Sequence, residues 1–198
     1  MTAFSQSIRA ALTEAQDALQ NLLADEATLA ALEQAGALLA DTFRAGGRVF
    51  SCGNGGSMCD AMHFAEELSG RYRDNRKPLA ATAISDASHL SCVANDYGYA
   101  DVFSRYLEAH ARAGDVLLAI STSGRSETVL RAARMAKEKG AKVIALTGKR
   151  DCPLADLGDI LIATPAGRYA DRVQELHIKT IHIMIELVER RLFPENYA

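Results

Sequence analysis

The chain alternates short apolar runs with longer segments of helical periodicity. The run at residues 116–120 is apolar on both faces, which is typical of a parallel sheet covered by helices on both sides. Such alternation predicts β-α-β units, and therefore an α/β fold with a three-layer, doubly wound parallel sheet of flavodoxin-like type. The other expected strands are residues 48–52, 79–84, 142–147 and 160–163.

Helical periodicity fills the segments between these runs. We expect helices at residues 57–68 and 127–139, and a mainly helical stretch at residues 86–113 that is broken near Asn95 and Asp96. The polar, basic residues 71–78 are interpreted as a solvated connector.

Two amphipathic helices are expected before the first strand, at residues 3–24 and 27–44. Their apolar stripe must pack on the domain or on another subunit. We therefore distinguish N-terminal helices at residues 1–46, with oligomer contacts, from a sheet domain at residues 47–198. A length of 198 residues suits a single domain overall.

The last expected helix, about residues 171–193, is apolar around most of its circumference. A helix of this kind is buried on several sides, which in so small a chain favours a subunit interface. We expect a homo-oligomer. His182 stands among isoleucines on this helix, and a histidine in such a setting is more often a satisfied core residue than a catalyst.

Composition excludes several classes of protein. The formal net charge of −3 gives no electrostatic footprint for nucleic acid. The apolar runs fall well short of the ~20 residues that cross a membrane, and the first residues do not read as a signal peptide, so we expect a cytoplasmic protein. The cysteines match no zinc or redox motif and are interpreted as buried thiols rather than disulfides. They are Cys52, Cys59, Cys92 and Cys152.

A glycine turn, Gly-Asn-Gly-Gly-Ser at residues 53–57, joins the first strand to a helix. Backbone N–H groups and the helix dipole favour an anion at such a position. The turn lacks the third glycine of a dinucleotide fingerprint and the lysine of a P-loop, so we expect no nucleotide. A ligand loop and a tight turn with Ser57 as N-cap remain alternatives.

The segment Ser-Thr-Ser-Gly-Arg-Ser at residues 121–126 follows the most apolar strand and opens a helix. It offers four hydroxyl groups and several backbone donors, with no carboxylate before Glu127. Capping one helix needs a single hydroxyl, whereas this many neutral donors at a helix N-terminus suit a phosphate monoester.

His63 and Glu67 are four residues apart, so they share one helix face. They could orient each other, bind a divalent metal together, or form an exposed ion pair. Gln174 and His182 lie about 12 Å apart along their helix, so their side chains converge only by leaning together or by serving a neighbouring subunit.

Several separated motifs, in order, carry a family resemblance. They are GNGGS, HFAEELSGRY, the pair Asn95-Asp96, GDVLLAISTSGRS, ALTG and YADRVQELHIKTIH. Together they resemble the sugar isomerase (SIS) domain and, more closely, the phosphoheptose isomerase family, over essentially the whole chain. The chain departs from this family at residues 149–153, Lys-Arg-Asp-Cys-Pro, where a glycine pair is common.

The resemblance implies the site residues. Glu67 matches the catalytic carboxylate and His182 the catalytic histidine. The zinc ligands of those members that bind zinc match His63, Glu67, Gln174 and His182, with one ion per subunit. The resemblance also implies a homotetramer with active sites at subunit contacts. The implied substrate-binding residues are Asn54, Gly55, Gly56, Ser57, Glu67, Asn95, Asp96, Ser121, Thr122, Ser123, Ser126, Asp171 and Gln174.

The implied reaction is the aldose–ketose isomerisation of D-sedoheptulose 7-phosphate to D-glycero-D-manno-heptose 7-phosphate through an enediol or enediolate. It is the first step towards ADP-heptose and the lipopolysaccharide core. The alternative is a non-catalytic SIS-domain protein that binds the replication initiator, which has no reason to keep both Glu67 and His182. A sugar-phosphate-sensing regulator is less favoured, because no helix-turn-helix segment accompanies the domain.

Overall fold

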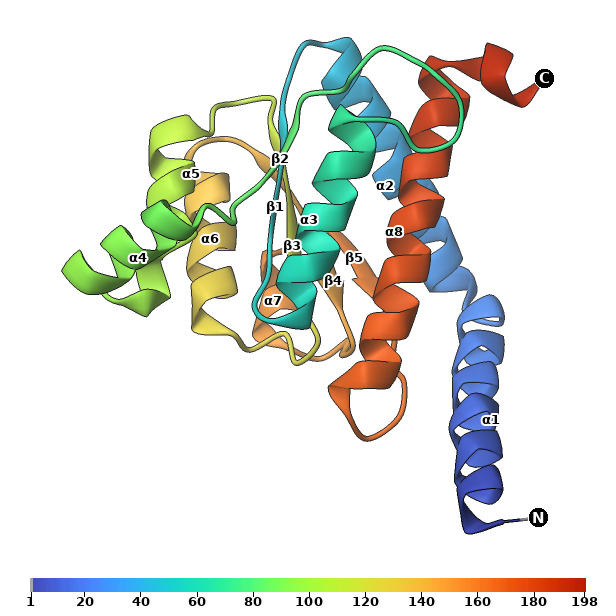
Figure 1. The fold of residues 1–198 in the computed structure, drawn as a ribbon. Coiled ribbons are helices and arrows are strands. Elements are labelled where there is room, and N and C mark those ends of the chain that lie inside the picture. The colour runs from blue at the N-terminus through green and yellow to red at the C-terminus, as the bar shows by residue number, and fades with distance from the viewer. Residues whose placement is uncertain (1) are drawn as a thin grey trace.

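A computed structural model describes residues 2–198. Five parallel strands form one sheet in the order β2-β1-β3-β4-β5 (Figure 1). This is the strand order of flavodoxin-like, doubly wound folds, and the predicted parallel sheet is confirmed. The strands are β1 (Val49–Cys52), β2 (Ala81–Ala83), β3 (Val116–Ser121), β4 (Lys142–Thr147) and β5 (Ile160–Ala163).

Helices cover both faces of the sheet. On one face lie α2 (Glu26–Arg44), α3 (Gly56–Ser69) and α8 (Ala170–Leu192), and on the other lie α4 to α7. Successive residues of a strand point to opposite faces of the sheet, so Leu118 packs against the layer of α2, α3 and α8, and Leu117 packs against the layer of α4 to α7. The second layer contains α4 (Ala87–Asp96), α5 (Ser104–His110), α6 (Glu127–Glu138) and α7 (Pro153–Leu157).

The predicted elements need four adjustments. Helix α4 runs through Asn95 and Asp96, and the break follows it, before a 3-10 turn at Tyr99–Asp101. Strand β2 is shorter than expected, because only Ala81–Ala83 pair with β1. Helix α7, which Pro153 opens, was not predicted. The final helix ends at Leu192, and Pro194 starts a 3-10 turn, Pro194–Tyr197.

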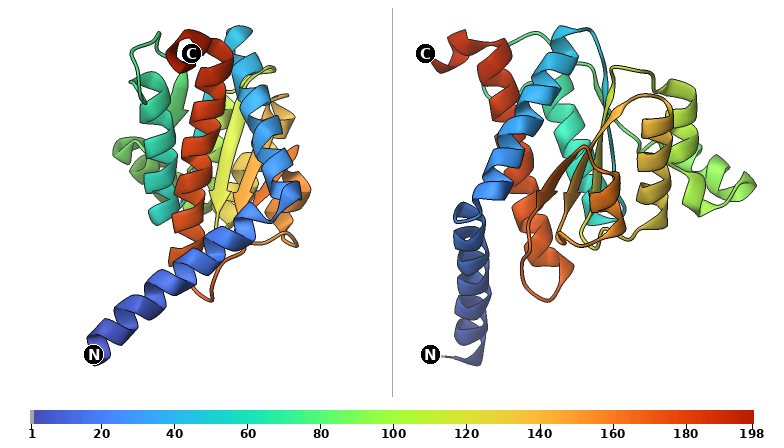
Figure 2. Two further views of the ribbon diagram at one scale, coloured as in Figure 1. Left: turned by 90° about the vertical axis from the view of Figure 1, so that its right-hand side faces the viewer. Right: turned by 180° about the vertical axis from the view of Figure 1, so that it is seen from behind.

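The two N-terminal helices behave differently. Asp25 caps α2 by accepting the Thr28 N–H at 3.2 Å, and the buried face of α2 joins the core against α8 and the sheet. Helix α1 (Ala3–Leu23) instead projects from the body of the molecule, as all the ribbon views show (Figures 1 and 2). The division of the chain at residue 46 stays a prediction.

The apolar stripe of α1 is covered only near its C-terminal end. Ala18 and Leu22 pack on Leu176, whereas Phe4, Ile8 and Leu12 are 83%, 61% and 67% exposed. The single chain therefore leaves one end of this stripe uncovered.

The breadth of apolar surface on α8 has an explanation inside the chain. Ile181, Met184, Ile185 and Val188 are completely buried in the core, and only Ile183 is substantially exposed, at 41%. The apolar circumference of α8 thus reflects its place between α2, α3 and the sheet, and it does not by itself require a subunit interface. Among the described residues, no helix combines the length and apolarity needed to span a bilayer.

Candidate active site

The order of the strands reverses between β1 and β3, and this is where a doubly wound sheet binds its ligands. The glycine turn follows β1 and the serine-rich loop follows β3, so the fold places both beside each other at the carboxyl edge. Asn54 joins them: its Nδ2 donates to Thr128 Oγ1 at 2.7 Å, and its Oδ1 accepts from Tyr99 OH at 3.1 Å.

The glycine turn is built by its backbone. Gly55 has φ +55°, a conformation that disfavours other residues, and it stands at the N-cap of α3 without a side-chain capping bond. Ser57 is not the N-cap that one interpretation of the sequence predicts, because it is buried within the first turn of α3. The Gln174 amide packs against Gly56, where a Cβ would lie 2.6 Å from Nε2.

The serine-rich loop holds its hydroxyl groups close together. Ser121 Oγ and Ser126 Oγ are 3.1 Å apart, and Ser121 Oγ also accepts the Gly124 N–H at 3.2 Å. Ser126 stands at the N-cap of α6, yet its hydroxyl makes no capping hydrogen bond there. The loop is therefore more than a cap and has the donors of an anion site at a helix N-terminus.

The unusual segment at residues 149–153 supports this loop from behind. Gly124 has φ +64°, and a Cβ at this position would collide with the buried Cys152 Sγ. Arg150 reaches back to α2, where it pairs with Asp25 and donates to Thr28 Oγ1 at 3.0 Å. Residues 149–153 thus pack beneath the loop, while the Ser121 and Ser126 hydroxyl groups lie at the N-terminus of α6.

A cavity of about 720 Å³ opens beside the loop. Thr122 and Ser123 line one side, the segment at residues 165–170 lines another, and Glu14 and Asp17 of α1 close it. Neither Glu67 nor His182 borders this space.

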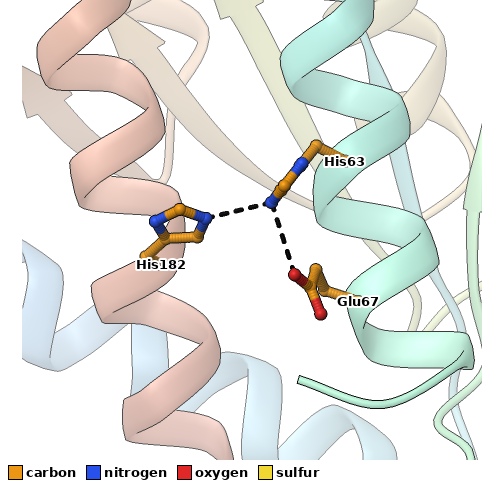
Figure 3. Close-up of side chains that lie close together, drawn as sticks. All are labelled: His63, Glu67 and His182. Carbon is orange, nitrogen blue, oxygen red and sulfur yellow. Dashed lines mark hydrogen bonds and ion pairs between the residues drawn. The ribbon is translucent and has the colours of Figure 1, made fainter. Parts of the chain in front are cut away.

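A second group of polar side chains lies between α3 and α8. His63 Nε2 and His182 Nε2 are 2.9 Å apart, and Glu67 Oε1 is 3.5 Å from His63 Nε2 (Figure 3). All three are partly buried, and one ligand atom from each lies within 4.8 Å of the others. The predicted pairing of His63 with Glu67 is confirmed, and His182 is a member of this cluster rather than a core residue.

The surroundings adjust the pKa values of the two predicted catalytic groups. Burial, followed by the negative charge of Glu66, raises the pKa of Glu67. Burial, followed by the proximity of His63, lowers the pKa of His182. Each shift disfavours the charged form, so Glu67 is a stronger base than an exposed carboxylate and His182 is a neutral imidazole at neutral pH.

The cluster and the two loops stand apart within one chain. Glu67 follows Gly56 by eleven positions, which places their Cα atoms about 16 Å apart along α3. Gln174 lies at the Gly56 end, and its inclusion in a ligand set with His63 stays a prediction. Asp171 is exposed at the start of α8, and Asn95 and Asp96 are exposed at the end of α4.

Sequence reasoning missed several neighbours of these groups. Tyr72 stacks near His182, with ring centroids 5.8 Å apart, and Asp60 lies one turn before His63. Burial raises the pKa of Asp60 to about 6, and its Oδ2 has no hydrogen-bond partner among residues 2–198. Tyr72 belongs to the recognised HFAEELSGRY motif, which could have singled it out. Nothing local distinguishes Asp60 or Tyr99.

The cysteines also differ from expectation. Cys52 and Cys152 are buried, but Cys59 and Cys92 are exposed, so the prediction of buried thiols is wrong for these two. Cys59 faces outward from α3, because the buried face of that helix is formed by Ala61, Phe64 and Leu68. All four thiols are free.

Comparison with known proteins gives a consistent result. Residues 12–148 match the family described as SIS domain. Phosphoheptose isomerase of Escherichia fergusonii is 58% identical over 96% of this chain and 98% of its own length. The structure is similar to that of phosphoheptose isomerase from Neisseria gonorrhoeae, with a TM-score of 0.87 and 38% identity over 94% of this chain and 99% of that one. It is also similar to that of a phosphoheptose isomerase from Francisella tularensis, with a TM-score of 0.88 and 30% identity over 96% of this chain and 100% of that one.

The sequence motifs, the strand order and the two functional loops agree with these similarities. The chain belongs to the SIS-domain family and, within it, to the phosphoheptose isomerases.

Proposed function

We propose that this chain isomerises D-sedoheptulose 7-phosphate to D-glycero-D-manno-heptose 7-phosphate, with Glu67 and His182 as the proton-handling residues. The observation that carries these roles is the convergence of Glu67, His63 and His182 at the α3–α8 contact. A protein that only bound a replication initiator would not need a carboxylate with a raised pKa beside two imidazoles, so that alternative is not favoured.

The phosphate is held by the serine-rich loop. Ser121, Thr122, Ser123 and Ser126 offer hydroxyl donors, and the N-terminus of α6 adds backbone N–H groups and its dipole. The glycine turn brings Asn54 and Gly55 to the same edge, where they face the sugar.

The reaction moves a carbon-bound proton from C1, which bears a hydroxyl group, to the neighbouring carbonyl carbon C2. Glu67 removes the carbon-bound proton, and its raised pKa brings its basicity closer to neutral pH. The electron pair moves into the enediolate, whose oxygen receives a hydrogen bond from the neutral imidazole of His182. Glu67 returns its proton to C2, and the hydroxyl proton of C1 passes to the C2 oxygen by way of the His182 imidazole, which leaves an aldehyde at C1 and a hydroxyl group at C2.

We propose that a divalent ion, zinc by preference, binds to His63, Glu67 and His182. The donor set of two imidazole nitrogens and one carboxylate oxygen, gathered within 4.8 Å, fits zinc. When bound, the ion would polarise the sugar oxygens as a Lewis acid. Gln174 lies about 12 Å from His182 along α8, with its amide at Gly56, so it could serve as the fourth ligand to the ion of a neighbouring subunit.

We also infer a homotetramer whose active sites combine two subunits. An extended heptulose phosphate spans only about 10 Å from phosphorus to C1, given carbon–carbon bonds of about 1.5 Å. Within one chain the glycine turn and Glu67 are about 16 Å apart along α3. The uncovered apolar residues of α1 supply a contact surface for such an assembly. A cytoplasmic location remains a prediction.

A coupled assay tests the reaction. Purified protein is supplied with sedoheptulose 7-phosphate, and the heptose 7-phosphate formed is consumed by a heptose-7-phosphate kinase whose ADP release is recorded. We expect turnover by the wild type, and loss of turnover in His182→Ala with the fold intact by circular dichroism. Absence of turnover in a folded, zinc-supplemented wild type would contradict the proposal.

A further inference from the structure

A buried ion pair lies next to the last turn of α3, which contains Glu67. Arg76 Nε donates to Glu189 Oε1 at 2.7 Å, and the two side chains are 1% and 0% exposed. Arg76 belongs to the basic connector at residues 71–78, so the prediction of a solvated connector is wrong at this residue. A buried charge pair is retained only where its remaining donors and acceptors are satisfied.

The other donors of Arg76 hold the end of α3. Its Nη2 donates to the carbonyl oxygen of Glu67 at 2.6 Å, and its Nη1 donates to the carbonyl oxygens of Leu68 and Gly70 at 2.8 and 3.1 Å. Carbonyl groups in the last turn of a helix have no partner within the helix, and a cation there also offsets the helix dipole. One guanidinium thus fixes the turn from which the Glu67 side chain extends.

The 3-10 turn Pro194–Tyr197 contacts both Glu189 and the connector that carries Arg76. Tyr197 OH donates to Glu189 Oε2 at 2.8 Å, so both carboxylate oxygens of Glu189 are engaged. Burial, together with this hydrogen bond, raises the pKa of Tyr197 to about 12. Asn196 Nδ2 donates to the Asn75 carbonyl oxygen at 3.3 Å, which draws the turn at Pro194–Tyr197 onto the connector.

We propose that Arg76, Glu189 and Tyr197 form a clamp that positions Glu67 for proton transfer. The three are positioning residues, because Arg76 forms its hydrogen bond with the backbone carbonyl group of Glu67, and Glu189 and Tyr197 hold Arg76 in place. The inference rests on the proposed catalytic role of Glu67. The turn Pro194–Tyr197 would then contribute to catalysis by holding Glu189 and, through it, Arg76.

The test compares Arg76→Lys and Tyr197→Phe with the control Arg190→Gln in the full-length, zinc-supplemented enzyme. Lysine keeps the charge but cannot reach Glu189 and three carbonyl groups together. Phenylalanine keeps the ring and removes one hydrogen bond. Arg190 forms an exposed pair with Glu186 on the same helix and packs over the Tyr197 ring, 4.4 Å from its centroid, without touching α3.

We expect kcat for sedoheptulose 7-phosphate to fall about tenfold to a hundredfold in Arg76→Lys, by a smaller factor in Tyr197→Phe, and not in Arg190→Gln. KM should stay within about twofold in all three, because the phosphate loop lies elsewhere. Hydrogen–deuterium exchange in the peptide over residues 64–70 should accelerate in the two clamp variants.

Two outcomes overturn the clamp. One is unchanged exchange in this peptide, and the other is accelerated exchange with an unchanged kcat. If Arg76→Lys does not fold, the same criteria apply to Tyr197→Phe. Glu67→Gln is assayed in parallel. Near-normal turnover there refutes the catalytic role of Glu67 itself, whereas loss of turnover in Glu67→Gln with normal turnover in both clamp variants refutes only the clamp.

Discussion

His63 and His182 place their Nε2 atoms 2.9 Å apart although 119 positions separate them in the chain. The contact joins α3 to α8, and Glu67 Oε1 lies 3.5 Å from the same His63 nitrogen. Two imidazoles at this distance share at most one proton in a hydrogen bond, or direct both lone pairs at one cation. This geometry makes the α3–α8 contact a chemical site as well as a packing contact.

Glu67→Gln should reduce kcat by about 10²- to 10⁴-fold, because the amide cannot accept the carbon-bound proton. KM should change little, since the phosphate loop is untouched. The matched control is Glu66→Gln, a neighbouring carboxylate whose side chain is 65% exposed, and it should retain most of the turnover. Steady-state kinetics measures kcat in both variants, and an equal decrease of kcat in the two would show that Glu67 is not the catalytic base.

Zinc should bind with a stoichiometry of one ion per subunit in calorimetric titration of chelator-treated protein. His63→Gln and His182→Gln each remove one of the three gathered donors, so each should weaken binding by at least about a hundredfold. His110→Gln, at an exposed position remote from α3 and α8, should bind as the wild type does. Wild-type affinity in the His63 and His182 variants would exclude this site.

Mixed subunits should restore activity that neither parent shows. One parent, Glu67→Gln, lacks the proposed catalytic base. The other parent, a Ser121→Ala, Ser123→Ala double variant, lacks two hydroxyl groups of the phosphate loop. We suppose that each site takes Glu67 from one subunit and the phosphate loop from another. After an equimolar mixture is unfolded and refolded, about half of the sites then contain an intact Glu67 and about half of these also contain an intact loop. The mixture should therefore recover up to about a quarter of the wild-type rate. A mixture as inactive as its parents would mean that one chain contains the complete site.

The α1 surface should control assembly. Ile8→Glu with Leu12→Glu places charges on exposed apolar positions, at 61% and 67%, and should shift the mass measured by light scattering towards smaller species. Arg9→Glu, on the same helix outside this stripe, serves as the control. An unchanged mass in the double variant would show that this stripe does not hold subunits together.

His177 should make the protein less stable in acid. It is completely buried, and burial, partly offset by a hydrogen bond with the Thr147 backbone, lowers its pKa to about 4. Between pH 6.5 and pH 4 the unfolded chain therefore binds more protons at this position, so stability is complete above this window and falls as pH decreases through it.

The expected loss at His177 is about 2–3 kcal/mol of unfolding free energy between pH 7 and pH 4.5. Urea unfolding at both pH values measures it. His177→Leu should show a smaller difference between the two pH values than the wild type, and the comparison isolates this side chain because all other titrating groups are shared. His110→Leu, at an exposed position, should keep the full difference.

The local sequence determined the order of the elements and the position of the loops. The apolar run at residues 116–120 indicated a covered strand, and it forms β3. Parallel strands bring the loops that follow them to one edge of the sheet, and there the glycine turn and the serine-rich loop lie side by side. The pairing of His63 with Glu67 also follows from helical periodicity alone.

Only the tertiary structure decided which elements pack against each other. Periodicity gives the face on which a side chain lies but not the partner that this face meets, so it could not bring His182 to His63 or bury Arg76 against Glu189. The same limit explains α1 and α8. Both are amphipathic or apolar in sequence, yet the sheet and two helices cover α8, while the far end of α1 extends beyond anything this chain can place against it.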